Sequence, residues 1–209
     1  MNNIGTQNIN TERLLLRRVK LDDAENMFAG WSNDKEIIRY MTWNAYDKTE
    51  QAKRFIAFCL EQNNTQEDAC AWAAELAVFC LEQYETGEDV YRWTIELKEE
   101  GKAVGMIDVA DSFPKIKAAQ IEYALSRAYW SKGIMSEALT AVIAYLFENT
   151  DYNRIEAAHH VNNPASGKVM QKSGMRFEGI HRQGGVDNKG DFCDLAYYAI
   201  LRSDISTRA

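Results

Sequence analysis

The chain has 209 residues, of which 46% are hydrophobic, and this is enough to fill the core of one large domain. Its 31 acidic and 24 basic residues give a net charge of -7, which argues against nucleic-acid binding as the main activity. The longest apolar run, residues 141–147, is far shorter than the roughly 18 residues of a membrane-spanning helix, so we expect no membrane crossing.

Cysteine spacing and the first residues bear on the cellular setting. The four cysteines show no CxxC pattern, and the start MNNIGTQNIN lacks the charge and apolar run of a signal peptide. We therefore expect a reducing, cytoplasmic setting. With two prolines and no Gly/Ser-rich linker, the sequence predicts one domain over residues 1–209, with its core at 11–200 and a polar, frayed tail at 201–209.

The first part of the chain predicts one strand followed by helices. Residues 11–19 are rich in strand-compatible apolar side chains, and a helix over 24–31 follows the capping pair Asp22 and Asp23. Helical periodicity returns near Lys35 and, after a new start at residues 49–50, continues through Leu60.

A short repeat interrupts this helical region, because the string FCLEQ occurs at residues 58–62 and again at 79–83. Two copies cannot build a solenoid. We interpret residues 59–90 as an extra helical insertion produced by local duplication, and an element that binds a partner or shapes the acceptor site is the alternative.

Three short strands, at residues 91–97, 103–110 and 117–125, predict an antiparallel meander. Apolar residues at i, i+3 and i+4 then predict a buried helix over 133–148. The rest of the chain predicts a strand at 154–161, then a helix from Pro164 to Gly174, and then two strands at 175–182 and 192–201. The fold class is therefore α+β with a mixed sheet.

The junction of strand 117–125 with the long helix carries the clearest chemistry. Unpaired N–H groups and the helix dipole favour an anion at a helix N-terminus, and Gly133 lets backbone approach a phosphate closely. An ordinary capped helix is the simpler alternative.

Two strings carry a family resemblance. YWSKGIMSEA, at residues 129–138, resembles the acyl-CoA pyrophosphate loop of the GCN5-related N-acetyltransferases (GNAT), and NPASGKVMQKSGMRFEG, at 163–179, resembles their second cofactor motif. The chain is most similar to the RimJ/RimL-type branch. The resemblance implies a mixed, mostly antiparallel sheet of about seven strands, flanked by helices and splayed at an acetyl-CoA site.

The same resemblance implies a cofactor site made from three segments. Backbone N–H groups of the loop hold the pyrophosphate, to which the Ser136 hydroxyl adds a donor and Lys132 adds charge. The strand at 123–125 hydrogen-bonds the pantetheine arm and leaves an N–H to polarise the thioester carbonyl. Asn163 holds the pantetheine. The implied cofactor residues are Tyr123, Ala124, Leu125, Ser131, Lys132, Gly133, Ile134, Met135, Ser136, Asn163 and Ser166.

Three residues are candidates for proton transfer. Ser166 lies in the matched motif and either protonates the leaving thiol or only orients the cofactor. Some other members carry a tyrosine acid four residues further on, where this chain has Met170. Glu122, on the cofactor strand, is a candidate base or an ordinary exposed residue. His159 and His160 must point to opposite faces of a strand, and we take His160 as the second candidate base.

The expected reaction is direct acetyl transfer to a primary amine, with no metal and no covalent acyl-enzyme. The resemblance to this branch implies that Trp43, Tyr46 and Tyr198 contact the acceptor. The alternative is that these aromatic side chains only pack in the core. A protein N-terminal α-amine is one acceptor class, and a polyamine, an amino acid or an antibiotic is the alternative. A non-catalytic acyl-CoA binding module is the rival function. Homodimers are common in the family, and the sequence leaves the oligomeric state open.

Overall fold

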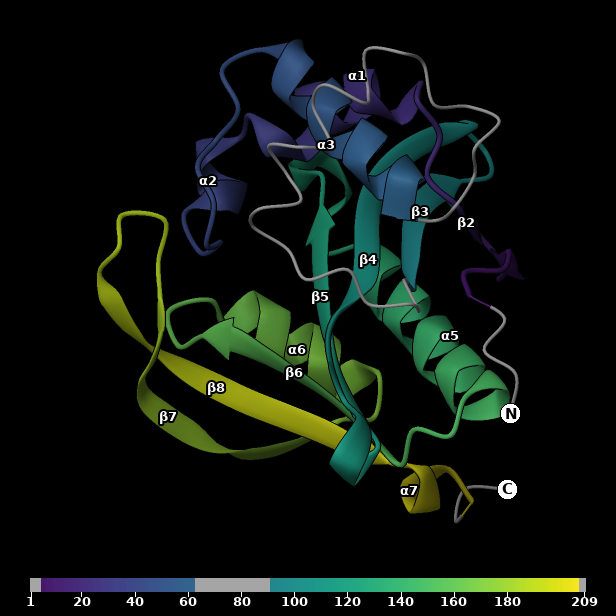
Figure 1. Cartoon of the computed structure of the whole chain (residues 1–209), viewed down its shortest axis with the longest axis vertical. Coiled ribbons are helices and arrows are strands. Elements are labelled where there is room, and N and C mark those ends of the chain that lie inside the picture. The colour runs from purple at the N-terminus through teal and green to yellow at the C-terminus, as the bar shows by residue number, and fades with distance from the viewer. Residues whose placement is uncertain (1–4, 63–90, 207–209) are drawn as a thin grey trace.

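The computed structural model describes residues 5–62 and 91–206 (Figure 1). These residues form a single eight-stranded sheet in the order β1-β2-β3-β4-β5-β6-β8-β7. The strands are β1 (Ile9–Asn10), β2 (Leu14–Arg17), β3 (Arg92–Leu97), β4 (Lys102–Phe113), β5 (Ala118–Leu125), β6 (Arg154–His160), β7 (Arg176–Val186) and β8 (Phe192–Leu201). The α+β class and the mixed sheet are confirmed. The sheet has one strand more than the seven expected, and the two-residue β1 is too short for a periodic signal.

Helices cover both faces of this sheet. The helices are α1 (Asp23–Met27), α2 (Lys35–Ile38), α3 (Thr49–Gln62), α5 (Ile134–Asn149), α6 (Pro164–Lys172) and α7 (Arg202–Ser206). The helix expected over 24–31 is instead split, because a π-helix over Phe28–Ser32 follows α1 directly. Of the described helices, none combines the length and apolar character needed to span a membrane.

Two hydrophobic cores lie on opposite faces of the sheet. One packs α5 and α6 against the strands, and the other packs α1 and α3. Strand β4 shows the division, because Ile107 belongs to the first core and its neighbour Met106 to the second. We call these the α5/α6 face and the α1/α3 face.

The sheet opens between β5 and β6, its one parallel pair among the described strands. The two strands pair only through Ala118, Ala119 and Gln120 of β5, although β5 continues to Leu125 and β6 to His160. Beyond Gln120 the strands diverge, and Figure 1 shows the gap that widens between the two halves of the molecule. The splay expected from the family resemblance is therefore present.

A buried ion pair joins α1 to the sheet. Two nitrogens of the Arg17 guanidinium donate to the two carboxylate oxygens of Asp23 at 2.8 Å, and Arg17 Nε donates to Glu96 at 2.6 Å. The Thr94 hydroxyl also donates to Asp23. Each buried charge thus has a partner, as burial requires.

Residues 202–206 correct the expectation of a frayed tail, because they form α7. The Arg202 guanidinium donates to the carbonyl oxygens of Phe147, Thr150 and Tyr152 at the end of α5. Those carbonyls have no partner inside a helix, so an arginine that caps them orders the segment. Residues 207–209 lie outside the described residues, as does most of the expected insertion at 59–90, including the second FCLEQ copy.

Candidate active site

The loop before α5 has the backbone shape of an anion-binding site. Gly133 is the N-cap residue, with φ of 77°, and Ser131 also has a left-handed φ of 60°. The first intrahelical hydrogen bond runs from Glu137 N–H to the Gly133 carbonyl. The N–H groups of residues 134–136 therefore have no partner inside the helix and are available to an anion.

Strand β5 presents its free edge to the splay. Over residues 121–125 it pairs with β4 on one side, and no described strand pairs with the other side. The Leu125 carbonyl, however, already accepts a hydrogen bond from the Trp130 indole at 2.9 Å. Because Ser126 N–H donates to the Val104 carbonyl of β4, alternation directs the backbone groups of Ala124 to β4 and those of Tyr123 to the open edge. An extended ligand therefore has the N–H and carbonyl of Tyr123 and the N–H of Leu125, whereas the backbone of Ala124 is already part of the β4 ladder.

A tyrosine that the sequence did not single out by its side chain reaches Ser166. The Tyr123 hydroxyl lies 2.8 Å from Ser166 Oγ and also donates to the Ser166 carbonyl at 3.2 Å. Burial raises the pKa of Tyr123, although the hydrogen bond to Ser166 opposes the shift. The phenol therefore stays protonated at neutral pH. Alternation along β5 could have placed this side chain on the same face as Ile121 and Leu125, but not next to Ser166.

Asn163 caps α6 through its backbone. Its N–H donates to the His160 carbonyl at 2.7 Å, and its own carbonyl accepts from Ser166 N–H at 3.2 Å. The side-chain amide makes no capping hydrogen bond. The turn thus fixes Ser166 next to Tyr123 and leaves the amide of Asn163 free to bind a ligand.

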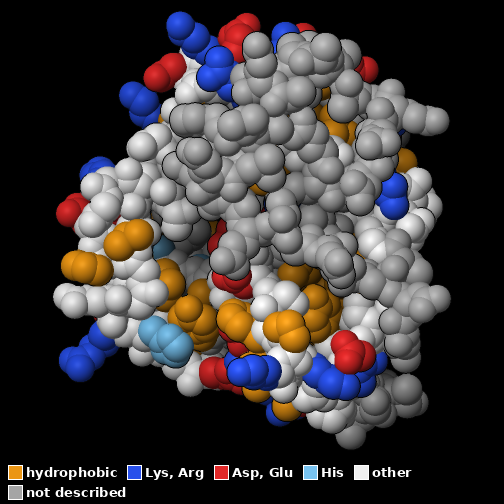
Figure 2. Space-filling model, viewed as in Figure 1, with side chains coloured by type: hydrophobic (Ala, Val, Ile, Leu, Met, Phe, Trp, Pro, Cys, Tyr) orange, Lys and Arg blue, Asp and Glu red, His pale blue; other side chains and the backbone are white. Residues whose placement is uncertain are grey.

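Glu122 points to the opposite face from its neighbour Tyr123. Strand register aligns it with Asp108 on β4, which in turn is opposite Arg92 on β3. Arg92 pairs with Asp108 at 3.3 Å. The three residues form a row across the α1/α3 face, and Figure 2 shows acidic side chains in the middle of the face viewed from α3.

The surroundings raise the pKa of Glu122 to about 7, mainly by removing the carboxyl from bulk water and then by the charges of Asp108 and Asp111. The Glu122 side chain is nevertheless exposed to solvent, so water reaches the carboxyl. Glu122 is thus a weak acid that exchanges its proton near neutral pH.

The two histidines face opposite sides of β6, as alternation predicted. His160 lies 5.4 Å from the Tyr40 ring, and its Nδ1 accepts a hydrogen bond from Asn162 N–H at 3.0 Å. In the neutral ring the proton is therefore on Nε2, and the basic nitrogen is already engaged. The Nδ1 lone pair of His160 is thus committed to the backbone.

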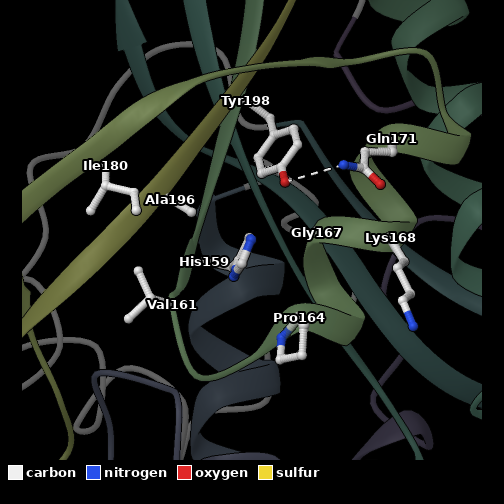
Figure 3. A pocket seen from close by; sticks show the side chains of 9 residues that line it. All are labelled: His159, Val161, Pro164, Gly167, Lys168, Gln171, Ile180, Ala196 and Tyr198. Atoms are coloured by element: carbon white, nitrogen blue, oxygen red, sulfur yellow. Dashed lines mark hydrogen bonds between the residues drawn. The ribbon is translucent and has the colours of Figure 1, made fainter.

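His159 lies instead in a hollow of about 320 Å³ on the α5/α6 face (Figure 3). Its ring stacks on Tyr198 at 5.7 Å and approaches α6 at Gly167, where a Cβ atom would lie only 2.6 Å from Nε2. Tyr198 is buried in the core of this face. His159 and Tyr198 thus support α6.

The three expected acceptor residues are not brought together. Trp43 packs on Tyr46 at 5.3 Å, and Tyr46 belongs to the α1/α3 face, where its N–H donates to the Ser32 carbonyl. Tyr198 belongs to the other face. Because side chains of successive strand residues alternate, the position of Tyr198 on its strand could not by itself say which face it joins.

The surroundings raise the pKa of both described cysteines. Burial raises the pKa of the Cys59 thiol to about 11, and it also raises the pKa of Cys193, followed by the charges of Asp187 and Asp194. Among the residues with described positions, no group of three or more His, Cys, Asp or Glu side chains could hold a metal ion.

The chain is similar to known acetyltransferases in sequence and in fold. Residues 13–176 match the acetyltransferase (GNAT) domain family. The chain is 30% identical over 198 residues to the uncharacterized N-acetyltransferase YoaA of Bacillus subtilis (strain 168), covering 93% of this chain and 96% of that protein. It is 30% identical over 101 residues to the ribosomal-protein-serine acetyltransferase of Escherichia coli (strain K12), covering 48% of this chain and 56% of that protein. The fold is similar to that of RimL, a ribosomal L7/L12 alpha-N-protein acetyltransferase solved with coenzyme A, with a TM-score of 0.71, 21% identity, and coverage of 93% of this chain and 98% of that one.

Proposed function

Because the chain belongs to the GNAT acetyltransferase family, we propose that it transfers the acetyl group of acetyl-CoA to a primary amine by direct attack. One observation carries the assignment of roles. At the splay, the adjacent residues Glu122 and Tyr123 point to opposite faces, Tyr123 toward Ser166 and Glu122 toward the α1/α3 face. A proton acceptor and a proton donor thus flank the gap between β5 and β6.

The residues present fit acetyl-CoA, which supplies an activated acetyl thioester. Gly133 provides the open, left-handed turn, and N–H groups of residues 131–136 suit a diphosphate. The free edge of β5 at the Tyr123 backbone and the Leu125 N–H suits an extended pantetheine arm, and Asn163 has an amide available for it.

Glu122 is the general base in this proposal. An α-amine has a pKa near about 8 and must lose a proton before it attacks a carbonyl carbon. The pKa of Glu122, raised to about 7, leaves much of the carboxylate ionised and still basic at neutral pH. Tyr46 and Trp43 lie on the same face as Glu122 and are the proposed acceptor contacts.

Ser166 and Tyr123 serve the departing thiol. A thiol of pKa about 8.5 is a fair leaving group, so proton donation assists its departure without being essential. The Tyr123 phenol has one proton, which it donates either to the Ser166 carbonyl or to Ser166 Oγ. In the second arrangement the serine proton is free to turn toward the thioester sulfur. Tyr123 stabilises the serine in that orientation.

The acceptor is proposed to be a protein N-terminal α-amine. Support comes from the names of the E. coli relative and of RimL, both of which are ribosomal-protein acetyltransferases. The carboxylates of Glu122 and Asp111 on one face would also attract a cationic amine, whereas the charge of Asp108 is paired with Arg92.

The test measures coenzyme A release by thiol titration. Peptides that begin with Ala or Ser are compared with polyamines, amino acids and aminoglycosides. Release with the peptides alone supports the proposal. Release with a small amine alone replaces the proposed acceptor class, and binding of acetyl-CoA without any release favours a non-catalytic acyl-CoA module.

A further inference from the structure

The turn between β1 and β2 touches the first turn of α5, although more than 100 residues separate them. Thr11 Oγ1 donates to Glu137 Oε1 at 2.5 Å, and Arg13 N–H donates to the same oxygen at 3.0 Å. The cofactor loop is therefore bordered by a segment that neither cofactor motif includes.

The Arg13 side chain bridges the loop and the helix. Its Nε donates to Glu137 Oε2 at 2.7 Å, and its Nη1 donates to the Lys132 carbonyl at 2.9 Å. Its Nη2 has no hydrogen-bond partner among the described residues and lies 3.4 Å from the point where a Cβ atom on Gly133 would be. The side chain is 42% exposed. One guanidinium nitrogen is thus free beside the glycine that opens the loop.

Charge at this point matters for a diphosphate. Partial burial opposes ionisation of Glu137, but hydrogen bonds from Thr11 and Arg13 lower its pKa, so it is a carboxylate at neutral pH. An unpaired carboxylate in the first turn of α5 would repel an anion bound at the same helix end. Arg13 neutralises that charge and still has a donor to spare.

We propose that Arg13 binds a phosphate oxygen of acetyl-CoA through Nη2 and so sets the preference for a phosphorylated cofactor. The inference rests on the proposed function. Two of the guanidinium nitrogens anchor to Glu137 and Lys132, so the third is held in place before the ligand arrives. A charge-assisted hydrogen bond of this kind has more effect than a neutral one.

A purely structural role for Arg13 predicts something different. An arginine that only fastens the β1–β2 turn to α5 would influence folding and the shape of the whole cofactor site. Its loss would then weaken phosphorylated and unphosphorylated ligands together. Loss of a phosphate contact weakens the binding of the phosphorylated ligand alone, and the effect depends on salt concentration.

The experiment measures dissociation constants of coenzyme A and of pantetheine by calorimetry at several salt concentrations. The proteins are the unmodified chain, Arg13→Gln, Arg13→Lys and Glu137→Gln. We expect Arg13→Gln to weaken coenzyme A binding about 10- to 30-fold and to leave the dissociation constant of pantetheine unchanged. The salt dependence of coenzyme A binding should also become smaller. Arg13→Lys should keep the salt dependence, and Glu137→Gln, which leaves the Arg13 charge unpaired, should not reduce it.

Melting temperatures show whether each variant folds. If Arg13→Gln does not fold, the Arg13→Lys variant provides the test. In that case a coenzyme A to pantetheine preference lower than that of the unmodified chain supports the proposal, and an unchanged preference overturns it. Equal weakening of both ligands, or an unchanged salt dependence in Arg13→Gln, also overturns it. If the unmodified chain does not bind coenzyme A, the proposed function itself fails.

Discussion

The α5/α6 face and the α1/α3 face of the sheet are built in different ways. On the α5/α6 face, the ligand groups come from two continuous segments, the loop at 131–136 and the turn at 163–166. On the α1/α3 face, Arg92, Asp108 and Glu122 come from three strands and meet only through strand register. The ligand groups of the α5/α6 face can be predicted from short sequence motifs. Those of the α1/α3 face can be identified only when the strand pairing is known.

This difference separates two kinds of chemistry. Backbone N–H groups at a helix start bind an anion whatever the neighbouring side chains are, so the motif carries its function locally. A carboxyl with a shifted pKa needs specific neighbours, and Glu122 owes its shift to burial, Asp108 and Asp111. Substitutions on the two faces should therefore separate cofactor binding from proton transfer.

The largest effect is expected from Glu122→Gln, which removes the proposed base. We expect kcat/KM to fall about 10³-fold while coenzyme A binding stays unchanged. In the unmodified chain the carboxylate form increases as pH rises through about 7, so kcat/KM should rise with it, and this limb should be absent in Glu122→Gln.

Asp111→Asn is the matched control for that profile. Asp111 contributes to the raised pKa of Glu122, so its neutralisation should move the limb to lower pH without removing it. A Glu122→Gln profile that keeps the same limb would assign the base to another group, and the contrast between the two faces would no longer hold.

Gly133→Glu tests the α5/α6 face. A side chain at φ of 77° is strained, and a carboxylate there repels a diphosphate, so the dissociation constant of coenzyme A should rise about 100-fold by calorimetry. Gly101→Glu is the control, because Gly101 has φ of 60° in open space on the β3–β4 turn. Normal coenzyme A binding by a folded Gly133→Glu protein would contradict the loop assignment.

Tyr123→Phe probes the link between the faces at the splay. Loss of the phenol should lower kcat about tenfold with little change in KM for acetyl-CoA. Combination with Ser166→Ala should add little, since the two groups act through one hydrogen bond. Tyr152→Phe, which loses a hydroxyl contact with exposed Ser112, is the control. Fully additive losses would show that Tyr123 does not act through Ser166.

The smallest effect is expected from Ser131→Gly. Relief of the left-handed φ of 60° outweighs the extra freedom of glycine in the unfolded chain, so stability should increase by about 0.5–1 kcal/mol in urea unfolding. Lys117→Gly, at φ of 52°, should give a smaller gain far from the cofactor loop, because it also removes the exposed ion pair of Lys117 with Asp151. A loss of stability in Ser131→Gly would mean that its side chain makes a compensating contact.

Much of the fold could be predicted from the sequence. The periodicity over 133–148 corresponds to α5, and the alternating segments correspond to β3 through β8. Elements without periodicity were missed or misjudged. The two-residue β1 pairs with nearby β2, and the π-helix at Phe28–Ser32 packs Trp31 into the core of the α1/α3 face. Helix α7 depends on Arg202, which donates to carbonyls at the end of α5.

For the candidate site, the sequence by itself determined the groups that act through local backbone. Gly133 at a helix start and the Asn163–Ser166 turn depend on neighbours within a few residues, which a string contains. Tertiary structure alone decided that Tyr123 reaches Ser166, that Asp108 lies opposite Glu122, and that Arg13 borders Gly133. These contacts join residues from 14 to more than 100 positions apart, and strand register and helix packing set them, so no local pattern encodes them.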